Sequence, residues 1–185
     1  MSSDSAWHIV PGRPGPLTEE TSAAALRQRY GDTAVTNVRI QIGDGETVPG
    51  TVLYEGDSLR RAEIIWKDTV RLLRPARVVL RGDRSRWQVG PGISLGTTLQ
   101  ELERMNGRPF ILAGFGWDYG GVVTDWSAGR LDSLLSGVKL YLDPGLAQRE
   151  SPAYSKVLGD RDYSSTTPSM QQLRPRVAQI FVDFE

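Results

Sequence analysis

Two short helix signals recur at one spacing along this chain, and they constrain its fold more than any other feature of the sequence. Each follows a tryptophan (Trp7 or Trp87) and a Gly/Pro-rich loop. Each has a threonine near its start and a glycine where a left-handed residue would end a helix. The matched pairs, all 76 residues apart, are Leu17 and Ile93, Thr21 and Thr97, Leu26 and Leu102, and Gly31 and Gly107. We interpret the match as an internal duplication of a helix-plus-sheet unit, with two unrelated capped helices as the alternative.

The boundaries of both helices can be predicted from capping residues. Thr21 or Ser22 would cap the first helix, in which Leu26 and Tyr30 are four residues apart and share a face. Thr98 and Glu101 have the spacing of a capping box, which predicts a second helix that runs through residue 106.

Alternating apolar residues after each helix predict antiparallel strands. Ala62, Ile64 and Trp66 would share one face of such a strand, and Asp44-Gly45 is a tight-turn signal. The strand candidates span 38–42, 51–54 and 62–67, with a further apolar stretch at 77–80, and then 109–117, 122–126, 134–142 and 177–184. We therefore predict an α+β protein built from two related helix-plus-antiparallel-sheet units, with short helices on one side of the sheet or sheets.

A chain of 185 residues is long enough for one domain or for two small halves. We expect a disordered tail at 1–6, a first α+β unit at 7–86 and a second at 87–185 that includes the C-terminal strand; the two units could also form one continuous domain. Residues 146–166 are polar and predict a long irregular loop. Thr167 and Pro168 then begin a helical turn that ends near Leu173.

The sequence argues against most common enzyme chemistries. The chain has no cysteine, which excludes thiol catalysis, disulfides, thiolate zinc sites and iron–sulfur clusters. Gly92–Gly96 matches the G-x-S-x-G pattern, but the one histidine, His8, lies upstream of Ser94, outside the order of that hydrolase fold. Asp160 and Asp162 are too few acids for a calcium loop. We expect no catalytic residue, no metal and no cofactor.

Charge and hydropathy bear on partners and location. A formal net charge of zero argues against a dedicated nucleic-acid binder. No run approaches the ~20 apolar residues of a membrane span. The first six residues lack the basic and apolar regions of a signal peptide. A mature exported domain whose leader has been removed would begin this way, and so would a cytosolic protein.

Basic residues concentrate in one segment of the chain. Residues 60–86 contain nine Lys/Arg against three acids, Glu63, Asp68 and Asp83. This segment would be either a face that steers an anion or a partner, or a solvated rim of arginines.

The densest group of large side chains lies at 114–121, where four glycines alternate with Phe115, Trp117 and Tyr119. In an extended strand these three rings would project from one face, and the glycines would allow another backbone or a ligand to approach the other. The rings would then be either core or an exposed recognition surface. The glycine spacing does not match the dinucleotide fingerprint, since the third glycine is one residue late. The candidate binding residues are Phe115, Trp117, Asp118, Tyr119, Asp125 and Trp126.

The segment Ile93-Ser94-Leu95-Gly96-Thr97-Thr98-Leu99, with Asn106-Gly107-Arg108-Pro109-Phe110, Gly114–Gly121 and Trp126, resembles a family of uncharacterised bacterial proteins, many of them predicted to be secreted or lipoprotein-like. Residues 7–30 and Glu63-Ile64-Ile65-Trp66-Lys67-Asp68 fit the same pattern. The resemblance implies an envelope location more than an activity, since the family has no established function or catalytic residues to transfer. The repeated loop-helix-sheet layout is also similar to that of β-lactamase inhibitory protein and of small outer-membrane assembly lipoproteins, which are protein-binding modules.

The leading functional hypothesis is a non-enzymatic protein-binding module of the bacterial cell envelope, in the periplasm or on the envelope, with a cytoplasmic location left open. The first alternative is a carbohydrate or cell-wall glycan binder whose rings stack on sugars. The second is a hydrolase in which Asp118 and Asp125 form a carboxylate pair. All three hypotheses place the site at the aromatic segment, and none involves nucleic acid or a membrane span.

Overall fold

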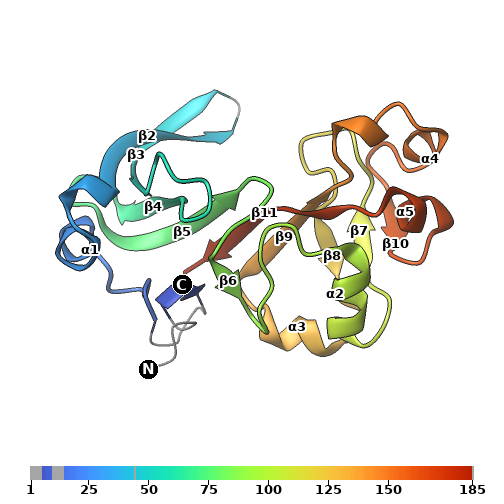
Figure 1. Cartoon of the computed structure of the whole chain (residues 1–185), viewed down its shortest axis with the longest axis horizontal. Helices are drawn as coiled ribbons and strands as arrows, with labels where there is room; N and C mark the ends of the chain where they lie inside the picture. Colours follow the sequence, from blue (N-terminus) through green and yellow to red (C-terminus); the bar gives the residue numbers. More distant parts are fainter. Residues whose placement is uncertain (1–5, 10–14, 44, 185) are drawn as a thin grey trace.

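The computed structural model describes residues 6–9, 15–43 and 45–184, and it is an α+β fold (Figure 1). A six-stranded antiparallel sheet has the order β2-β3-β4-β5-β11-β9, a three-stranded sheet the order β10-β7-β8, and β1 pairs in parallel with β6. The strands are β1 His8–Ile9, β2 Val35–Gly43, β3 Glu46–Leu53, β4 Ala62–Asp68, β5 Leu73–Arg81, β6 Gln88–Val89, β7 Ile111–Ala113, β8 Val123–Asp125, β9 Val138–Asp143, β10 Asp162–Ser164 and β11 Arg176–Asp183. The helices are α1 Ala23–Tyr30, η2 Asp32–Ala34, α2 Leu99–Asn106, α3 Arg130–Leu134, η3 Leu146–Gln148, α4 Pro152–Ser155 and α5 Pro168–Leu173.

Each half of the chain has one of the two repeated helices, followed by a series of antiparallel strands. In the first half α1 is followed by the meander β2, β3, β4 and β5. In the second half α2 is followed by β7, β8 and β9, and β11 comes after an insertion that holds η3, α4, β10 and α5. The bridge between Val122 and Tyr141 joins the β7–β8 hairpin to β9, so the strand order of the second half follows that of the first. Figure 1 shows the two halves on either side of β5 and β11.

The starts of α1 and α2 are built from matching hydrogen bonds. Thr21 Oγ1 accepts from the backbone N–H of Thr18, and Thr97 Oγ1 accepts from that of Ser94. The N-cap hydroxyl of Ser22 accepts from the N–H three residues on, as does that of Thr98. Gly31 and Gly107 both have positive φ and close their helices through the N–H of the glycine. The predicted α+β class with two related units is confirmed, since the 76-residue spacing recurs in the bonds themselves.

The same correspondence extends to the strand that each helix start contacts. Ser22 bridges Leu73 at the beginning of β5, and Thr98 bridges Arg176 at the beginning of β11. Residues 73 and 176 are therefore equivalent, and counting five and six residues onward makes 78 equivalent to 181 and 79 equivalent to 182. In the register of β5 with β11, Val78 pairs with Val182 and Val79 pairs with Phe181. Replacing each residue by its equivalent turns the first of these pairs into the second. The two units are thus related by an approximate two-fold axis between β5 and β11, and the sheet is continuous across it.

A second contact between equivalent segments lies where β1 meets β6. Ile9 pairs with Val89, and the rings of Trp7 and Trp87 meet edge to face with centroids 4.9 Å apart. His8 Nε2 lies 2.7 Å from the carbonyl oxygen of Gly90, which gives the one histidine a structural partner.

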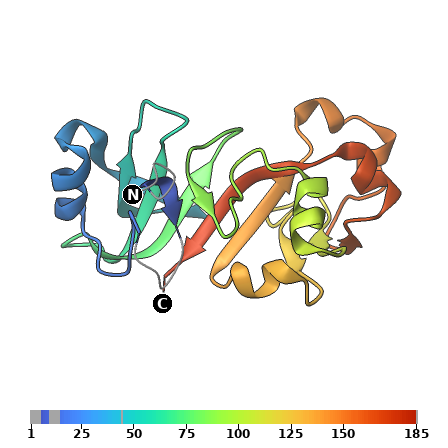
Figure 2. The ribbon, with the colours of Figure 1, turned by 60° about the horizontal axis from the view of Figure 1, so that its bottom comes forward.

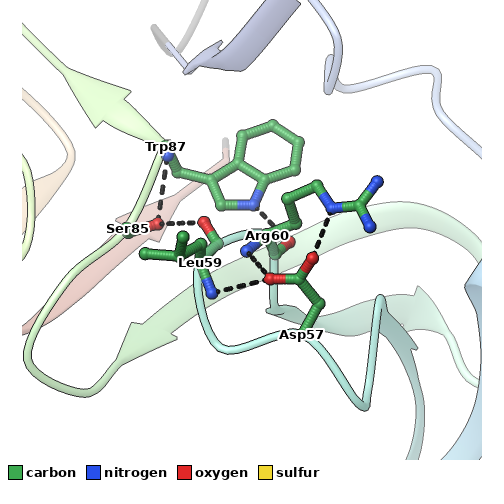
Figure 3. Close-up of polar contacts among 5 residues, drawn as sticks. All are labelled: Asp57, Leu59, Arg60, Ser85 and Trp87. Atoms are coloured by element: carbon green, nitrogen blue, oxygen red, sulfur yellow. Dashed lines mark hydrogen bonds and ion pairs between the residues drawn. The ribbon is translucent and has the colours of Figure 1, made fainter.

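Polar contacts fasten the β3–β4 connection to the start of the second half (Figure 3). Trp87 Nε1 donates to the carbonyl oxygen of Arg60 at 2.7 Å, and Ser85 Oγ accepts from the Trp87 N–H at 3.0 Å. Asp57 accepts from the backbone N–H groups of Leu59 and Arg60 and pairs with the Arg60 guanidinium at 2.7 Å. These residues shape a turn and bury an indole, which is a structural role.

The core covers one face of the large sheet and includes residues of both repeated helices, of β7 and of the later helices α3, α4 and α5. The shared face of Ala62, Ile64 and Trp66 is confirmed, because all three side chains are buried. Leu26 of α1 and Leu102 of α2 are buried in the same cluster. Figure 2 shows α1 and α2 in the two halves with β11 crossing between them. The opposite face of the sheet receives neither of these helices and is left open.

Two expectations differ from the structure, and two fall on residues outside it. Residues 146–166 are not an irregular loop, because they contain η3, α4 and β10. The predicted strand at 109–117 shrinks to β7, Ile111–Ala113. Residues 1–5 of the expected tail, and Asp44 of the expected turn, lie outside the described residues.

The capping box of α2 predicts an acid-sensitive contribution to stability. Glu101 Oε2 accepts from the N–H and the hydroxyl of Thr98, each at 2.8 Å, and these bonds lower the pKa of Glu101 below its ordinary value. A carboxyl whose folded-state pKa is lowered stabilises the fold above its unfolded pKa, and this stabilisation is lost as pH falls through the folded value. The wild-type protein should therefore lose more unfolding free energy than Glu101→Gln when the pH falls from 7 to 3, and the difference should be up to about 1 kcal/mol. Urea unfolding at the two pH values measures the difference, and an unchanged acid dependence would contradict it.

Candidate functional site

The open face of the large sheet carries a groove of about 1100 Å³ that takes residues from both halves of the chain. One side is formed by β2, and the floor by side chains of β3, β4, β5, β11 and β9. The other side is formed by the loop between β7 and β8, together with Arg149 and Tyr154 of the insertion. Because the approximate two-fold axis passes between β5 and β11, the groove lies over the junction of the two units.

Strand register explains which side chains form the floor. Alternate residues of a strand point to opposite faces. Ile180 and Val182 of β11 point into the core, so Gln179 and Phe181 point into the groove. Leu140 and Leu142 of β9 are buried in the same way, which leaves Tyr141 on the groove face. Phe181 and Tyr141 lie with ring centroids 5.0 Å apart.

Four of the six predicted binding residues line this groove. Phe115 is 3% exposed and stacks on Tyr154 at a centroid distance of 5.8 Å, so it forms part of the wall. Trp117 is half-buried, and its Nε1 donates to the carbonyl oxygen of Gly114 at 2.9 Å. Tyr119 is 60% exposed, and its ring meets Trp117 at 5.4 Å. Asp118, which lies between Trp117 and Tyr119 in the sequence, is exposed and also lines the groove.

The extended conformation predicted for these residues is wrong, because residues 114–121 form a compact loop. Gly116 and Gly121 have φ of 84° and 77°, and the N–H of Gly120 bonds back to the carbonyl oxygen of Trp117. The expected close approach of another backbone at the glycines does occur. A Cβ at Gly121 would lie 2.0 Å from the carbonyl oxygen of Leu142. The glycines thus let the loop pack directly on β9, which directs the rings toward the groove.

The other two predicted residues do not belong to the groove. Trp126 is 9% exposed and its ring centroid lies 5.0 Å from that of Phe110 in the core, so of the two alternatives for the aromatic rings this one is core and does not line the groove. Its carbonyl oxygen accepts from the buried side chain of Asn106, which fixes it further. Asp125 ends β8 and accepts from the N–H of Ser127 at 2.6 Å. Asp118 and Asp125 are therefore not brought together along the groove.

Arginine–carboxylate pairs set the electrostatics of the floor. Glu63 lies between Arg61 at 3.0 Å and Arg81 at 3.6 Å. Arg81 also donates to the side-chain oxygen of Gln179 at 2.9 Å and lies over the ring of Phe181. Both arginines belong to the basic segment 60–86. Burial raises the pKa of the nearby Tyr141 phenol, so this hydroxyl stays protonated and can donate a hydrogen bond at neutral pH.

Sequence reasoning missed Tyr141, Tyr154 and Phe181 as groove residues. Tyr141 and Phe181 could have been found, because each is an aromatic residue on the polar side of an alternating strand. Tyr154 carried no such signal, since its place depends on how the insertion folds against the loop at 114–121.

The remaining candidate motifs have structural partners. Ser94 Oγ donates to the carbonyl oxygens of Ser85 and Leu95.

In the described part of the chain, no group of three or more His, Asp or Glu side chains is arranged to hold a metal ion. None of the helices within the described ranges is both long and apolar enough to cross a bilayer.

Comparison of the chain with protein-family models, with curated proteins and with solved structures found no match.

Proposed function

We propose that the chain is a non-enzymatic protein-binding module and that the groove over the sheet junction is its binding surface. The observation that carries the proposal is the composition of the lining, which combines the aromatic residues Trp117, Tyr119 and Tyr141 with Arg61 and Arg81. Trp, Tyr and Arg are the residue types that dominate the binding energy of protein interfaces. A location in the cell envelope is a further part of the proposal and rests on the sequence resemblance alone.

The way these side chains are held also favours binding. Trp117 is fixed by a hydrogen bond to its own loop, and Phe115 is wedged against Tyr154. The floor residues stand on strands of a continuous sheet. Side chains ordered before a partner arrives lose less conformational entropy on binding. The groove is therefore organised for recognition without a large rearrangement.

Glycan binding is the second candidate, and one observation favours it. The exposed carboxylate of Asp118 lies in sequence between Trp117 and Tyr119, so rings that could stack on a sugar stand beside an acceptor for hydroxyl groups. A carboxylate hydrolase is less well supported, because Asp125 lies away from the groove lining.

Affinity capture from a native envelope extract tests the proposal. The immobilised protein should retain one or more proteins that the Trp117→Ala/Tyr119→Ala variant does not retain. Loss of two central aromatic residues should weaken such a complex at least about thirtyfold.

Val70→Ala/Leu134→Ala is the matched control, since both side chains are exposed and apolar and lie outside the groove. Thermal unfolding of each variant confirms that it is folded. Capture of the same proteins by the groove variant and the control would remove the groove as the binding surface. Retention of glycan rather than protein, lost in the groove variant alone, would select the second candidate.

A further inference from the structure

A second hollow of about 1000 Å³ adjoins the groove at the end of β5 and the start of β11. The two share the lining residues Arg81, Asp143, Arg149 and Gln179, so a bound segment can pass from one to the other. Exposed Leu146 lies in the second hollow and offers it an apolar contact.

The second hollow is far more basic than the groove. Its lining has two acids, Asp83 and Asp143, against five arginines: Arg81, Arg84, Arg149, Arg174 and Arg176. The groove itself is nearly balanced, with four arginines and three acids in its lining. In a chain of zero net charge, this places a local excess of three positive charges beside the aromatic residues.

Several of these arginines retain guanidinium N–H donors that can bind a ligand. All five side chains are exposed. Arg84 and Arg174 form no ion pair within the described ranges, and Arg176 donates to the carbonyl oxygen of Gly96 at 3.4 Å. Arg149 has a single carboxylate partner, Asp143, at 3.0 Å. Planar guanidinium groups bind carboxylates through two parallel hydrogen bonds, so such a cluster favours a ligand that carries several carboxylates.

We infer that the partner presents an acidic peptide segment, whose Asp or Glu side chains lie over the arginine cluster while a neighbouring aromatic or apolar side chain enters the groove. The inference rests on the proposed function and specifies the partner's chemistry. A peptide is favoured over nucleic acid because the basic hollow is continuous with an aromatic groove and includes Leu146, whereas a nucleic-acid site would extend the positive charge along a backbone.

Fluorescence anisotropy with defined peptides tests the inference. The probe is a labelled peptide of about ten residues that alternates Glu and Tyr and spans about 35 Å when extended. A matched peptide replaces every Glu by Gln. The Glu peptide should bind about tenfold or more tightly than the Gln peptide at low salt, and the difference should shrink as salt is added.

Two charge-matched variants assign the effect to the cluster. Arg84→Gln/Arg174→Gln should reduce affinity for the Glu peptide to that for the Gln peptide and leave the Gln peptide unaffected. Arg29→Gln/Arg104→Gln removes the same charge from α1 and α2, at positions outside the linings of the groove and of the second hollow, and should have little effect.

The possible outcomes separate the inference from the proposed function. Equal binding of the two peptides, lost in Trp117→Ala/Tyr119→Ala, would overturn the acidic specificity and leave the groove as a protein-binding surface. Binding of neither peptide would also overturn the inference, and the capture experiment decides the proposed function independently. Tighter binding of a single-stranded oligonucleotide that depends on Arg84 and Arg174 would replace the acidic peptide by a polyanion.

Discussion

Trp87→Ala is expected to lower the free energy of unfolding by about 3–5 kcal/mol, the range for removing a large aromatic side chain from a core. Trp87 is completely buried. Its ring packs on Trp7 across the contact of the two units, and its Nε1 bonds to the Arg60 carbonyl oxygen (Figure 3). The substitution removes these contacts and leaves the partly buried Arg60 carbonyl oxygen without its donor. Urea unfolding followed by far-UV circular dichroism measures the loss.

Trp87→Phe separates packing from the hydrogen bond. The phenyl ring keeps most of the buried area but cannot donate to Arg60, so we expect a smaller loss, of about 1–2 kcal/mol. If the β1–β6 contact joins the halves into one cooperative unit, every variant should unfold in a single transition. A loss below about 1 kcal/mol for Trp87→Ala would show that this contact contributes little to the fold.

Gly121→Ala is expected to destabilise the protein by about 2–5 kcal/mol and to displace the aromatic loop. Backbone strain at positive φ contributes about 1–2 kcal/mol, and the steric clash about 1–3 kcal/mol or more. The new Cβ would lie 2.0 Å from the Leu142 carbonyl oxygen, which cannot move away freely because the Leu142 N–H donates to the Gly121 carbonyl oxygen at 2.9 Å. Any relief of the clash must therefore separate the loop from β9. Unfolding by urea measures the stability, and partner capture reports the displaced rings.

Gly107→Ala is the matched control for this substitution. Gly107 also has positive φ, 79°, but the nearest atom to its added Cβ is Arg130 Nε at an ordinary 3.7 Å. Only the backbone strain of about 1–2 kcal/mol should remain, with partner capture unchanged. Equal losses for Gly107→Ala and Gly121→Ala would mean that the close approach to β9 is not what requires glycine at 121.

The sequence predicted both repeated helices well because their boundaries depend on local chemistry. A capping hydroxyl and the N–H that it binds lie three residues apart, so Ser22 and Thr98 predict the starts of their helices independently of the rest of the fold. Alternation likewise predicted β4, β9 and β11, in which each buried residue lies next to a less buried one, although the strand predicted at 134–142 starts only at Val138, after α3. The strand at 109–117 was overpredicted because apolar and glycine residues suit an extended chain and a tightly packed loop equally.

The candidate site was predicted in part for a related reason. Glycines among aromatic rings correctly indicated a close backbone approach, and Phe115, Trp117, Asp118 and Tyr119 do line the groove. The local sequence could not separate Trp117 from Trp126, because burial depends on what packs against each ring. Phe110 and the Asn106 side chain bury Trp126, and both belong to distant segments.

The sequence by itself determined the α+β class and the two capped helices, because helix caps and strand alternation depend on residues that lie close together in the chain. The 76-residue spacing indicated a duplication but left two unrelated helices as the alternative. Only the tertiary structure decided that β11 joins β5, so that two units share one sheet with an open face. It alone brought the loop at 114–121, the insertion and the arginines of both halves around that face. These contacts join residues far apart in the chain, and they depend on the packing of the whole molecule.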